Sequence, residues 1–174
     1  STRETAWKSL AKVNMTTFQP GDSLLLKRGE AWSGYVHPLG SGTQGHPIVM
    51  SSYGTGPPPQ INTGGVYPTA VLLLNQEYWD IEDLEVTNLH PTNGASSRYG
   101  VYIISNAFGV IHHVVLRNLS VHDVNGNPAS KTCGGIFFEV MGGTPGWFDS
   151  IIVEGCDVYD VSPVGIANTS PLAT

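Results

Sequence analysis

The sequence predicts an all-β fold in which strands stack as a parallel β-helix, a solenoid. One template occurs three times, as Ile81-x-x-Leu84-x-Val86-x-Asn88, Leu116-x-x-Leu119-x-Val121-x-Asp123 and Val153-x-x-Cys156-x-Val158-x-Asp160. The copies are offset by about 35 and 37 residues, a spacing typical of stacked repeat architectures. Apolar and polar residues alternate within each copy, which is the period of a half-buried strand.

A second strand type recurs between these copies, over residues 71–74, 101–104, 136–139 and 166–169. Gly100, Gly135 and Gly165 precede three of these segments. Two strand types that alternate, with turns too short for crossover helices, favour strands lying in register on their counterparts one repeat earlier. An ordinary β-sandwich remains the alternative, although antiparallel pairing does not favour the same sidedness at matched positions.

The amino-terminal segment differs from the repeats. Trp7, Leu10 and Ala11 fall at helical spacing after Thr5, so residues 5–14 predict a short amphipathic helix that closes one end of the stack. Strands are expected at residues 23–27 and 47–51, on either side of glycine-rich turns. The whole chain, residues 1–174, is expected to form a single domain.

Composition agrees with a turn-rich all-β chain, because 21 Gly and 12 Pro occur in 174 residues of which 13% are charged. A formal charge of −6, with 8 Lys and Arg, argues against a nucleic-acid partner. No apolar run is long enough for a membrane span, so we expect no membrane partner. Of the two cysteines, Cys156 occupies a core position of the template, where a free thiol is favoured over a disulfide.

Several motifs extend this prediction. They are Thr5-Ala6-Trp7-Lys8-Ser9-Leu10, Pro20-Gly21-Asp22, Lys27-Arg28-Gly29-Glu30-x-Trp32-x-Gly34, Gly40-Ser41-Gly42-Thr43-x-Gly45-x-Pro47-Ile48 and Tyr53-Gly54-Thr55-Gly56. Together they resemble the opening coils of secreted right-handed parallel β-helix proteins of the pectate-lyase-like superfamily. The resemblance implies a right-handed helix, secretion and carbohydrate chemistry, on a fold that hosts lyases, hydrolases, epimerases and inert adhesins.

Members of that superfamily are usually longer. We therefore expect the chain to be the amino-terminal part of a larger protein, with its last coil covered by missing sequence or by another chain.

The candidate site follows from the strand pattern. If Val86, Val121 and Val158 point inward, His122 lies on an outer face between a Thr and a Tyr of neighbouring coils, with Asp123 beside it. Long loops over residues 89–99 and 124–134 leave this strand and wall a groove. These loops carry His90, Asn93, Arg98, Tyr99, Asn125, Asn127 and Lys131.

Two reactions suit such a groove. In β-elimination, Arg98 or Lys131 offsets a uronate charge while His122 or Tyr99 removes a proton. In hydrolysis, two carboxyl groups flank the glycosidic bond, and the candidates are Asp123, Glu139, Asp157 and Asp160. Trp147, in a glycine-rich loop, is a candidate for stacking on a sugar ring.

We predict a polysaccharide lyase or glycoside hydrolase with a polysaccharide substrate, and the alternative is a non-catalytic binding or adhesive module. No cofactor is predicted, although acidic oxygens could bind calcium. His112 and His113 are expected to point to opposite faces.

Overall fold

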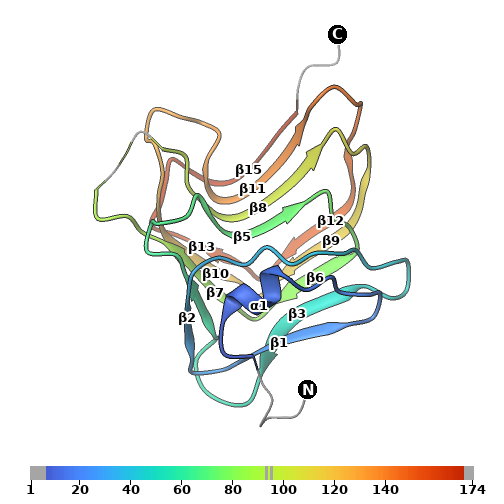
Figure 1. Cartoon of the computed structure of the whole chain (residues 1–174). Helices are drawn as coiled ribbons and strands as arrows, with labels where there is room; N and C mark the ends of the chain where they lie inside the picture. Colours follow the sequence, from blue (N-terminus) through green and yellow to red (C-terminus); the bar gives the residue numbers. More distant parts are fainter. Residues whose placement is uncertain (1–6, 93, 95, 171–174) are drawn as a thin grey trace.

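The computed structural model describes residues 7–92, 94 and 96–170. Its named strands pair in parallel and form three sheets within these residues (Figure 1). The first sheet contains β1 (Ser23–Lys27), β3 (Ile48–Tyr53), β6 (Trp79–Glu82), β9 (Ile111–Arg117) and β12 (Phe148–Glu154). The second contains β2 (Ala31–Ser33), β4 (Gln60–Asn62), β7 (Glu85–Asn88), β10 (Ser120–Asn125) and β13 (Asp157–Val158), with β14 (Val161–Ser162) also paired to β10. The third contains β5 (Thr69–Leu74), β8 (Tyr99–Asn106), β11 (Gly134–Met141) and β15 (Val164–Thr169).

The strands stack in the register that the repeated template predicts. Val86, Val121 and Val158 are paired across β7, β10 and β13. The apolar template position two residues earlier stacks in the same way. The amide of Ser120, after Leu119, donates to the carbonyl of Leu84, and the amide of Asp157, after Cys156, donates to the carbonyl of Leu119, both at 2.9 Å. The chain thus visits the three sheets in the same order in each repeat.

Turns between the sheets align as well as strands do. Tyr78, His113 and Ser150 share one register position of the first sheet, just before β6 and within β9 and β12, and each has a φ between +47 and +63°. Asp83, Asn118 and Gly155 share another such position before the second sheet. Asn, Asp and Gly tolerate this left-handed conformation best, which explains their recurrence at sharp bends.

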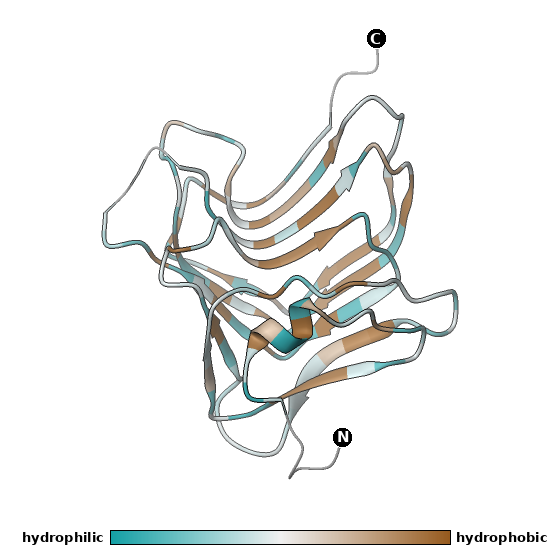
Figure 2. Ribbon diagram, viewed as in Figure 1, coloured by the Kyte–Doolittle hydropathy of each residue, from teal (hydrophilic) through white to brown (hydrophobic). Residues whose placement is uncertain are grey.

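The core lies between the three sheets. Hydrophobic residues run along the strands of each sheet (Figure 2), and the inward members such as Ile81, Leu116 and Ile136 are fully buried. Trp79 is the largest of these buried side chains, and its indole N–H donates to the carbonyl of Gly40 at 3.0 Å. This interior holds the outward-facing side chains of each sheet in fixed rows.

The last repeat is less covered than the repeats before it. Val153, Val158 and Ile166 occupy the register positions of Leu116, Val121 and Ile136, which are fully buried. Val153 is 36% exposed and Ile166 is 50% exposed. The inward row of side chains therefore continues to the last repeat without a further layer of described residues above it.

The predicted fold class, a right-handed parallel β-helix with a short amino-terminal capping helix, is corrected to an all-β fold of three parallel sheets. The predicted helix over residues 5–14 is reduced to α1, Leu10–Asn14, which buries Leu10 and Val13. Thr5, the predicted cap, lies outside the described residues, and the Ser9 side chain makes no capping hydrogen bond. The sequence repeat correctly indicates which strands pair. The predicted right-handed β-helix rested on the family resemblance, and the comparisons with known proteins reported below point to a different family.

Candidate functional site

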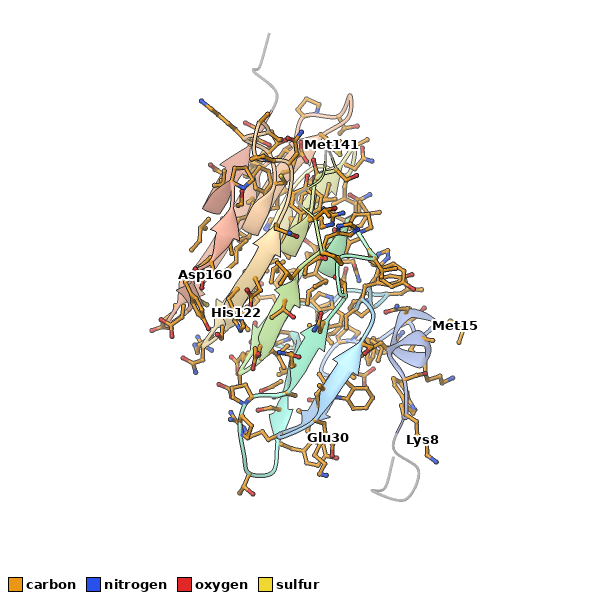
Figure 3. The ribbon with its side chains drawn as sticks, turned by 90° about the vertical axis from the view of Figure 1, so that its left-hand side faces the viewer. Lys8, Met15, Glu30, His122, Met141 and Asp160 are labelled. Atoms are coloured by element: carbon orange, nitrogen blue, oxygen red, sulfur yellow. The ribbon has the colours of Figure 1, made fainter. Side chains whose placement is uncertain are left out.

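The side chain of His122 lies on the outer face of the second sheet, on β10 (Figure 3). Its backbone pairs with Thr87 of β7, and its ring stacks on Tyr159 with centroids 4.8 Å apart and planes 8° apart. The predicted position between a Thr and a Tyr is therefore confirmed. Stacking fixes the plane of the imidazole, and 15% of the side chain remains exposed.

Two carboxylates hold the two ring nitrogens of His122. Nδ1 lies 2.9 Å from Oδ2 of Asp123, and Nε2 lies 3.2 Å from Oε1 of Glu85. The side-chain amide of Gln60, one strand further along the sheet, donates to the same oxygen of Glu85. β4 and β7 thus contribute one polar side chain each to a continuous row, and β10 contributes two, His122 and Asp123.

Asp123 is the accessible member of this group. Its side chain is 48% exposed, and its φ of +52° places it at a bulge between His122 and Val124. Because Val124 pairs with Asn88, the template equivalence of Asn88 with Asp123 fails by one residue. The bulge turns the Asp123 carboxylate back onto the imidazole, and such re-aiming of a side chain is typical of β-bulges.

Arg98 does not join this group, contrary to the prediction that it offsets a substrate charge in the groove beside His122. The Arg98 side chain is 7% exposed, and its Nε and Nη1 donate to the carbonyls of Gly65 and Asn125 at 3.3 and 3.1 Å. Lys131 is exposed on the second long loop, and no hydrogen bond or ion pair in the described chain links either residue to His122. Arg98 therefore serves to tie the loops to the sheet.

The polar residues of the long loops also bind backbone groups. Asn125 and the main chain of His90 exchange two hydrogen bonds of 2.7 Å, which join the two loops. The side chain of Asn127 accepts the amide of Ala129 at 3.0 Å. Tyr99 is buried on the third sheet, where its hydroxyl donates to the carbonyl of Thr132 at 2.7 Å, so it is separated from His122.

Asn93 and Trp147 are the remaining residues that the sequence predicts to contact the substrate. Asn93 lies outside the described residues. Trp147 is 59% exposed in the loop before β12, where its ring is available for a ligand.

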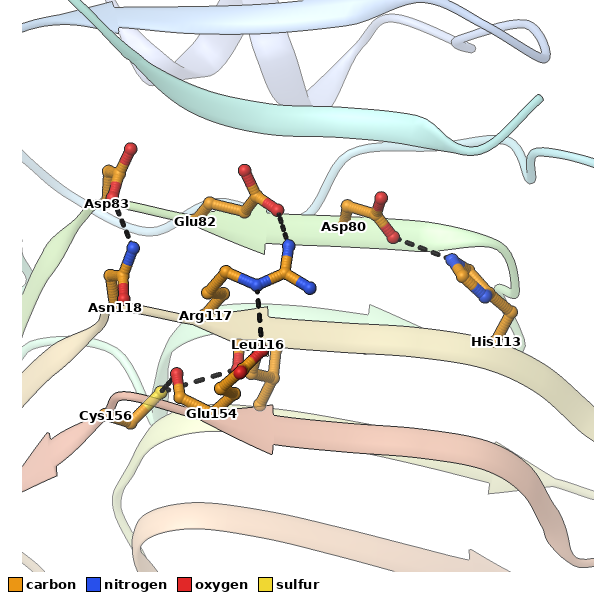
Figure 4. Close-up of polar contacts among 9 residues, drawn as sticks. All are labelled: Asp80, Glu82, Asp83, His113, Leu116, Arg117, Asn118, Glu154 and Cys156. Atoms are coloured by element: carbon orange, nitrogen blue, oxygen red, sulfur yellow. Dashed lines mark hydrogen bonds and ion pairs between the residues drawn. The ribbon is translucent and has the colours of Figure 1, made fainter. Parts of the chain in front are cut away.

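The outer face of the first sheet carries a different row of side chains. Arg117 bonds Glu82 on one neighbouring strand and Glu154 on the other, and Asn118 donates to Asp83 at 3.1 Å (Figure 4). Hydrogen bonds from Arg117 to both carboxylates raise its pKa, so this bridge stays charged. These carboxylates are already satisfied by protein groups, as expected of a structural ladder.

His112 and His113 lie on the same side of the chain, contrary to the prediction. Both rings stack on Tyr78, at 6.1 and 5.8 Å, and they pair with Asp149 and Asp80 respectively. The φ of +47° at His113 breaks the strand alternation that would have separated them.

The described residues contain no group of three or more His, Cys, Asp or Glu side chains that could hold a metal ion. The calcium prediction stays a prediction. In the same part of the chain, no helix has the length and apolar character needed to cross a membrane.

Both cysteines, Cys133 and Cys156, are free thiols. This agrees with the prediction for Cys156.

Comparisons with known proteins point to one kind of enzyme. The chain superimposes with a TM-score of 0.89 on the crystal structure of a GH136 lacto-N-biosidase from Eubacterium ramulus, with 31% identity over 97% of this chain and 33% of that chain. The chain is similar to lacto-N-biosidases. The selenomethionine derivative of the same protein gives a TM-score of 0.80 over 89% of this chain. A lacto-N-biosidase from Bifidobacterium longum subsp. longum is 28% identical over 92% of this chain, which corresponds to 14% of that protein.

No family model matches the chain. The chain spans about a third of the solved relative and a smaller share of the curated one. The predicted kinship with pectate-lyase-like proteins, and the polysaccharide lyase activity drawn from it, are wrong in the light of these relatives. The motifs behind that resemblance are turns and strand starts, which report how strands stack and carry no information about bond cleavage.

Proposed function

We propose that this chain is part of a glycoside hydrolase that acts on oligosaccharides containing a lacto-N-bioside unit. The observation that carries the proposal is the similarity to the GH136 lacto-N-biosidase over 97% of this chain at 31% identity. A carbohydrate substrate of this kind replaces the polysaccharide of the earlier prediction. Secretion stays a prediction.

Within that enzyme, we assign the row of Glu85, His122 and Asp123 to contact with the substrate. Asp123 is the accessible acid of the three, and His122 fixes its orientation through the 2.9 Å contact. Glycoside hydrolysis needs carboxyl groups at the glycosidic bond, and a proton transferred by a positioned carboxyl group contributes about 10²- to 10⁴-fold in rate. Glu85 contacts the other ring nitrogen, Nε2, and keeps the ring from rotating away.

The half-exposed apolar row of the last repeat supports a further proposal about architecture. Val153, Val158 and Ile166 continue rows whose earlier members are fully buried, and the solved relative is about three times as long as the matched segment. We propose that a further layer of parallel strands, contributed by the rest of the natural protein, covers them.

The activity is tested with the natural protein that carries this sequence and p-nitrophenyl lacto-N-bioside. Release of p-nitrophenol is expected, with no unsaturated product from uronic-acid polysaccharides. Asp123→Asn should lower kcat/KM by about 10²-fold or more if the carboxyl group transfers a proton. Asp157→Asn is the matched control, because Asp157 is exposed on the same sheet and its backbone pairs with Ser120.

The outcomes separate the two statements. If Asp123→Asn keeps full activity, the assignment of Glu85, His122 and Asp123 to the substrate site is refuted, but the proposed enzyme class is not. Absence of hydrolysis of this substrate and of neutral oligosaccharides by the unaltered natural protein refutes the enzyme class.

A further inference from the structure

The outer face of the third sheet carries an aromatic cluster that is separate from the core. Tyr99, Tyr102 and Phe137 form it together with Ile104 and Cys133. The rings of Tyr99 and Tyr102 stack at 3.9 Å with planes 10° apart, and Phe137 meets both edge-on. Rings packed in this way form a rigid floor on an outward face.

One carboxylate stands at the border of this floor. Glu139 on β11 occupies the outward row that contains Leu74 and Ile104 on earlier strands and Thr169 on the next. The Tyr102 hydroxyl donates to Oε2 of Glu139. The other oxygen, Oε1, accepts no hydrogen bond from any described residue, so it has capacity for an external donor.

A hollow of about 300 Å³ lies at this carboxylate. Its lining consists of Glu139, Val140, Met141, Gly142, Thr169 and Ser170. Met141, labelled in Figure 3, is 37% exposed and gives the hollow an apolar wall, whereas Thr169 offers a hydroxyl. A few oriented polar groups beside apolar surface are typical of small-molecule sites.

The surroundings of Glu139 select the chemistry of the ligand. The carboxylates on or next to the first sheet that are described above are bonded to Arg117, Asn118, His112 or His113. In contrast, no Lys, Arg or His is among the residues of this aromatic cluster or of the hollow. A negative charge without a cation repels anionic ligands, and a partly buried carboxylate requires hydrogen-bond donors. Hydroxyl groups supply such donors without adding charge.

Burial against the aromatic floor, followed by the bond to Glu139, raises the pKa of Tyr102 far above its ordinary value of 10.0. The phenol therefore keeps its proton at neutral pH and remains a donor to Oε2. Tyr99, whose hydroxyl bonds the long loop at Thr132, packs against Tyr102 and fixes the position of the phenol. The carboxylate is consequently held through Oε2, and Oε1 accepts no hydrogen bond from the described residues.

We propose that the hollow at Glu139 binds a neutral saccharide, whose hydroxyl groups donate to Oε1 of Glu139 beside Met141 and Thr169. The saccharide class rests on the proposed function, whereas the placement of the site rests on the geometry of Glu139. This site lies on the third sheet and is distinct from the row around His122 on the second.

The test is a titration of the 174-residue chain with lacto-N-biose, galactose and N-acetylglucosamine, followed by calorimetry and saturation-transfer NMR. Glu139→Gln keeps the size of the side chain and an acceptor for Tyr102 but removes the charge. A hydrogen bond to a charged group contributes about 1.5–3 kcal/mol, so affinity should fall by about tenfold or more. The matched control is Glu154→Gln on the first sheet, where the carboxylate accepts from Arg117, and its affinity should equal that of the unaltered chain.

Saturable binding of any of these saccharides that is weakened in Glu139→Gln alone supports the proposal. It is overturned if no saccharide binds at millimolar concentration, or if Glu139→Gln and Glu154→Gln bind equally well. An unchanged thermal midpoint in both variants excludes unfolding as the cause of a loss. Hydrolysis is measured separately from saccharide binding. If the natural protein is active but no saccharide binds at Glu139, this site is refuted and the proposed enzyme class is not.

Discussion

Three equivalent glycines provide a sharp test of the stacked arrangement. Gly100, Gly135 and Gly165 are the second residues of β8, β11 and β15, successive strands of the third sheet, and none has a positive φ. A Cβ added at Gly135 would lie 2.6 Å from the carbonyl oxygen of Gly165 and 2.6 Å from Cγ1 of Val158. Ordinary contacts lie at about 3.5–4.0 Å, so the backbone of the next repeat has to move.

Gly135→Ala and Gly165→Ala should change the stability of the chain in opposite directions. Overpacking typically costs about 1–3 kcal/mol, and we expect the upper value for Gly135→Ala because one clashing atom is a backbone oxygen that cannot rotate away. At Gly165 the nearest atom is Cγ1 of Val158 at 4.0 Å. Gly165→Ala should therefore stabilise the chain by about 0.4–1 kcal/mol, since alanine reduces the entropy of the unfolded state.

The assay is thermal unfolding followed by circular dichroism, checked by urea titration. For a chain of this size the Gly135→Ala loss corresponds to a fall of roughly 6–12 °C in the midpoint, whereas Gly165→Ala should raise the midpoint by roughly 1–4 °C. Gly100→Ala, whose Cβ would lie 2.7 Å from the carbonyl oxygen of Gly135, should behave like Gly135→Ala. Equal midpoints for Gly135→Ala and Gly165→Ala would refute the argument that the last repeat is uncovered.

Three further outcomes are expected. Val121→Ala removes two buried carbons at about 0.8 kcal/mol each and leaves a cavity, so it should lower the free energy of unfolding in urea by about 2–3 kcal/mol. Val158→Ala should lower it distinctly less, because Val158 is only partly buried. In the natural protein the two losses should become equal if a further layer covers Val158. Because the folded state raises the pKa of Tyr102, the folded chain retains a proton that the unfolded chain loses above about pH 10. Stability should thus be full below pH 10 and fall as the pH rises further, less steeply in Tyr102→Phe. Under native conditions a thiol reagent should label the partly exposed Cys156 before the fully buried Cys133, and equal labelling rates would contradict the burial.

The register of the strands was predictable because it depends on a local pattern. Alternation of apolar and polar residues fixes which side of a strand is buried, and the repeated template fixes which strands stack. Val86, Val121 and Val158 accordingly form the predicted row. The same reasoning placed His122 correctly between Thr87 and Tyr159.

The partners of polar side chains were not predictable to the same extent. Glu85 approaches His122 across 37 residues of sequence, and this contact depends on rotamers rather than on the repeat. Arg98 is a charged residue in a long loop, which favours exposure, but the carbonyls of Gly65 and Asn125 receive it in the interior of the loops. Backbone carbonyls leave no mark in a sequence, so nothing distinguished this arginine from a solvated one.

Backbone conformation at the bends accounts for the remaining errors. The positive φ values at His113 and Asp123 reverse the strand alternation locally. At His113 the reversal brings two consecutive imidazoles onto one side, and at Asp123 it inserts a bulge that breaks the match with Asn88. Histidine carries no turn signal of its own, whereas Asp at a strand end is a recognised one.

The three outer faces of the molecule differ in how their carboxylates are satisfied, and this difference favours the third sheet as a ligand-binding surface. On the first sheet, Arg117 neutralises carboxylates on both sides, which leaves little capacity for a ligand. On the second, His122 lies between Glu85 and Asp123, and Asp123 keeps an exposed edge. On the third, Glu139 is held by a neutral phenol on a rigid aromatic floor, so its charge is oriented without being neutralised. A carboxylate in that state gains most from uncharged donors, such as the hydroxyl groups of the neutral saccharide proposed above.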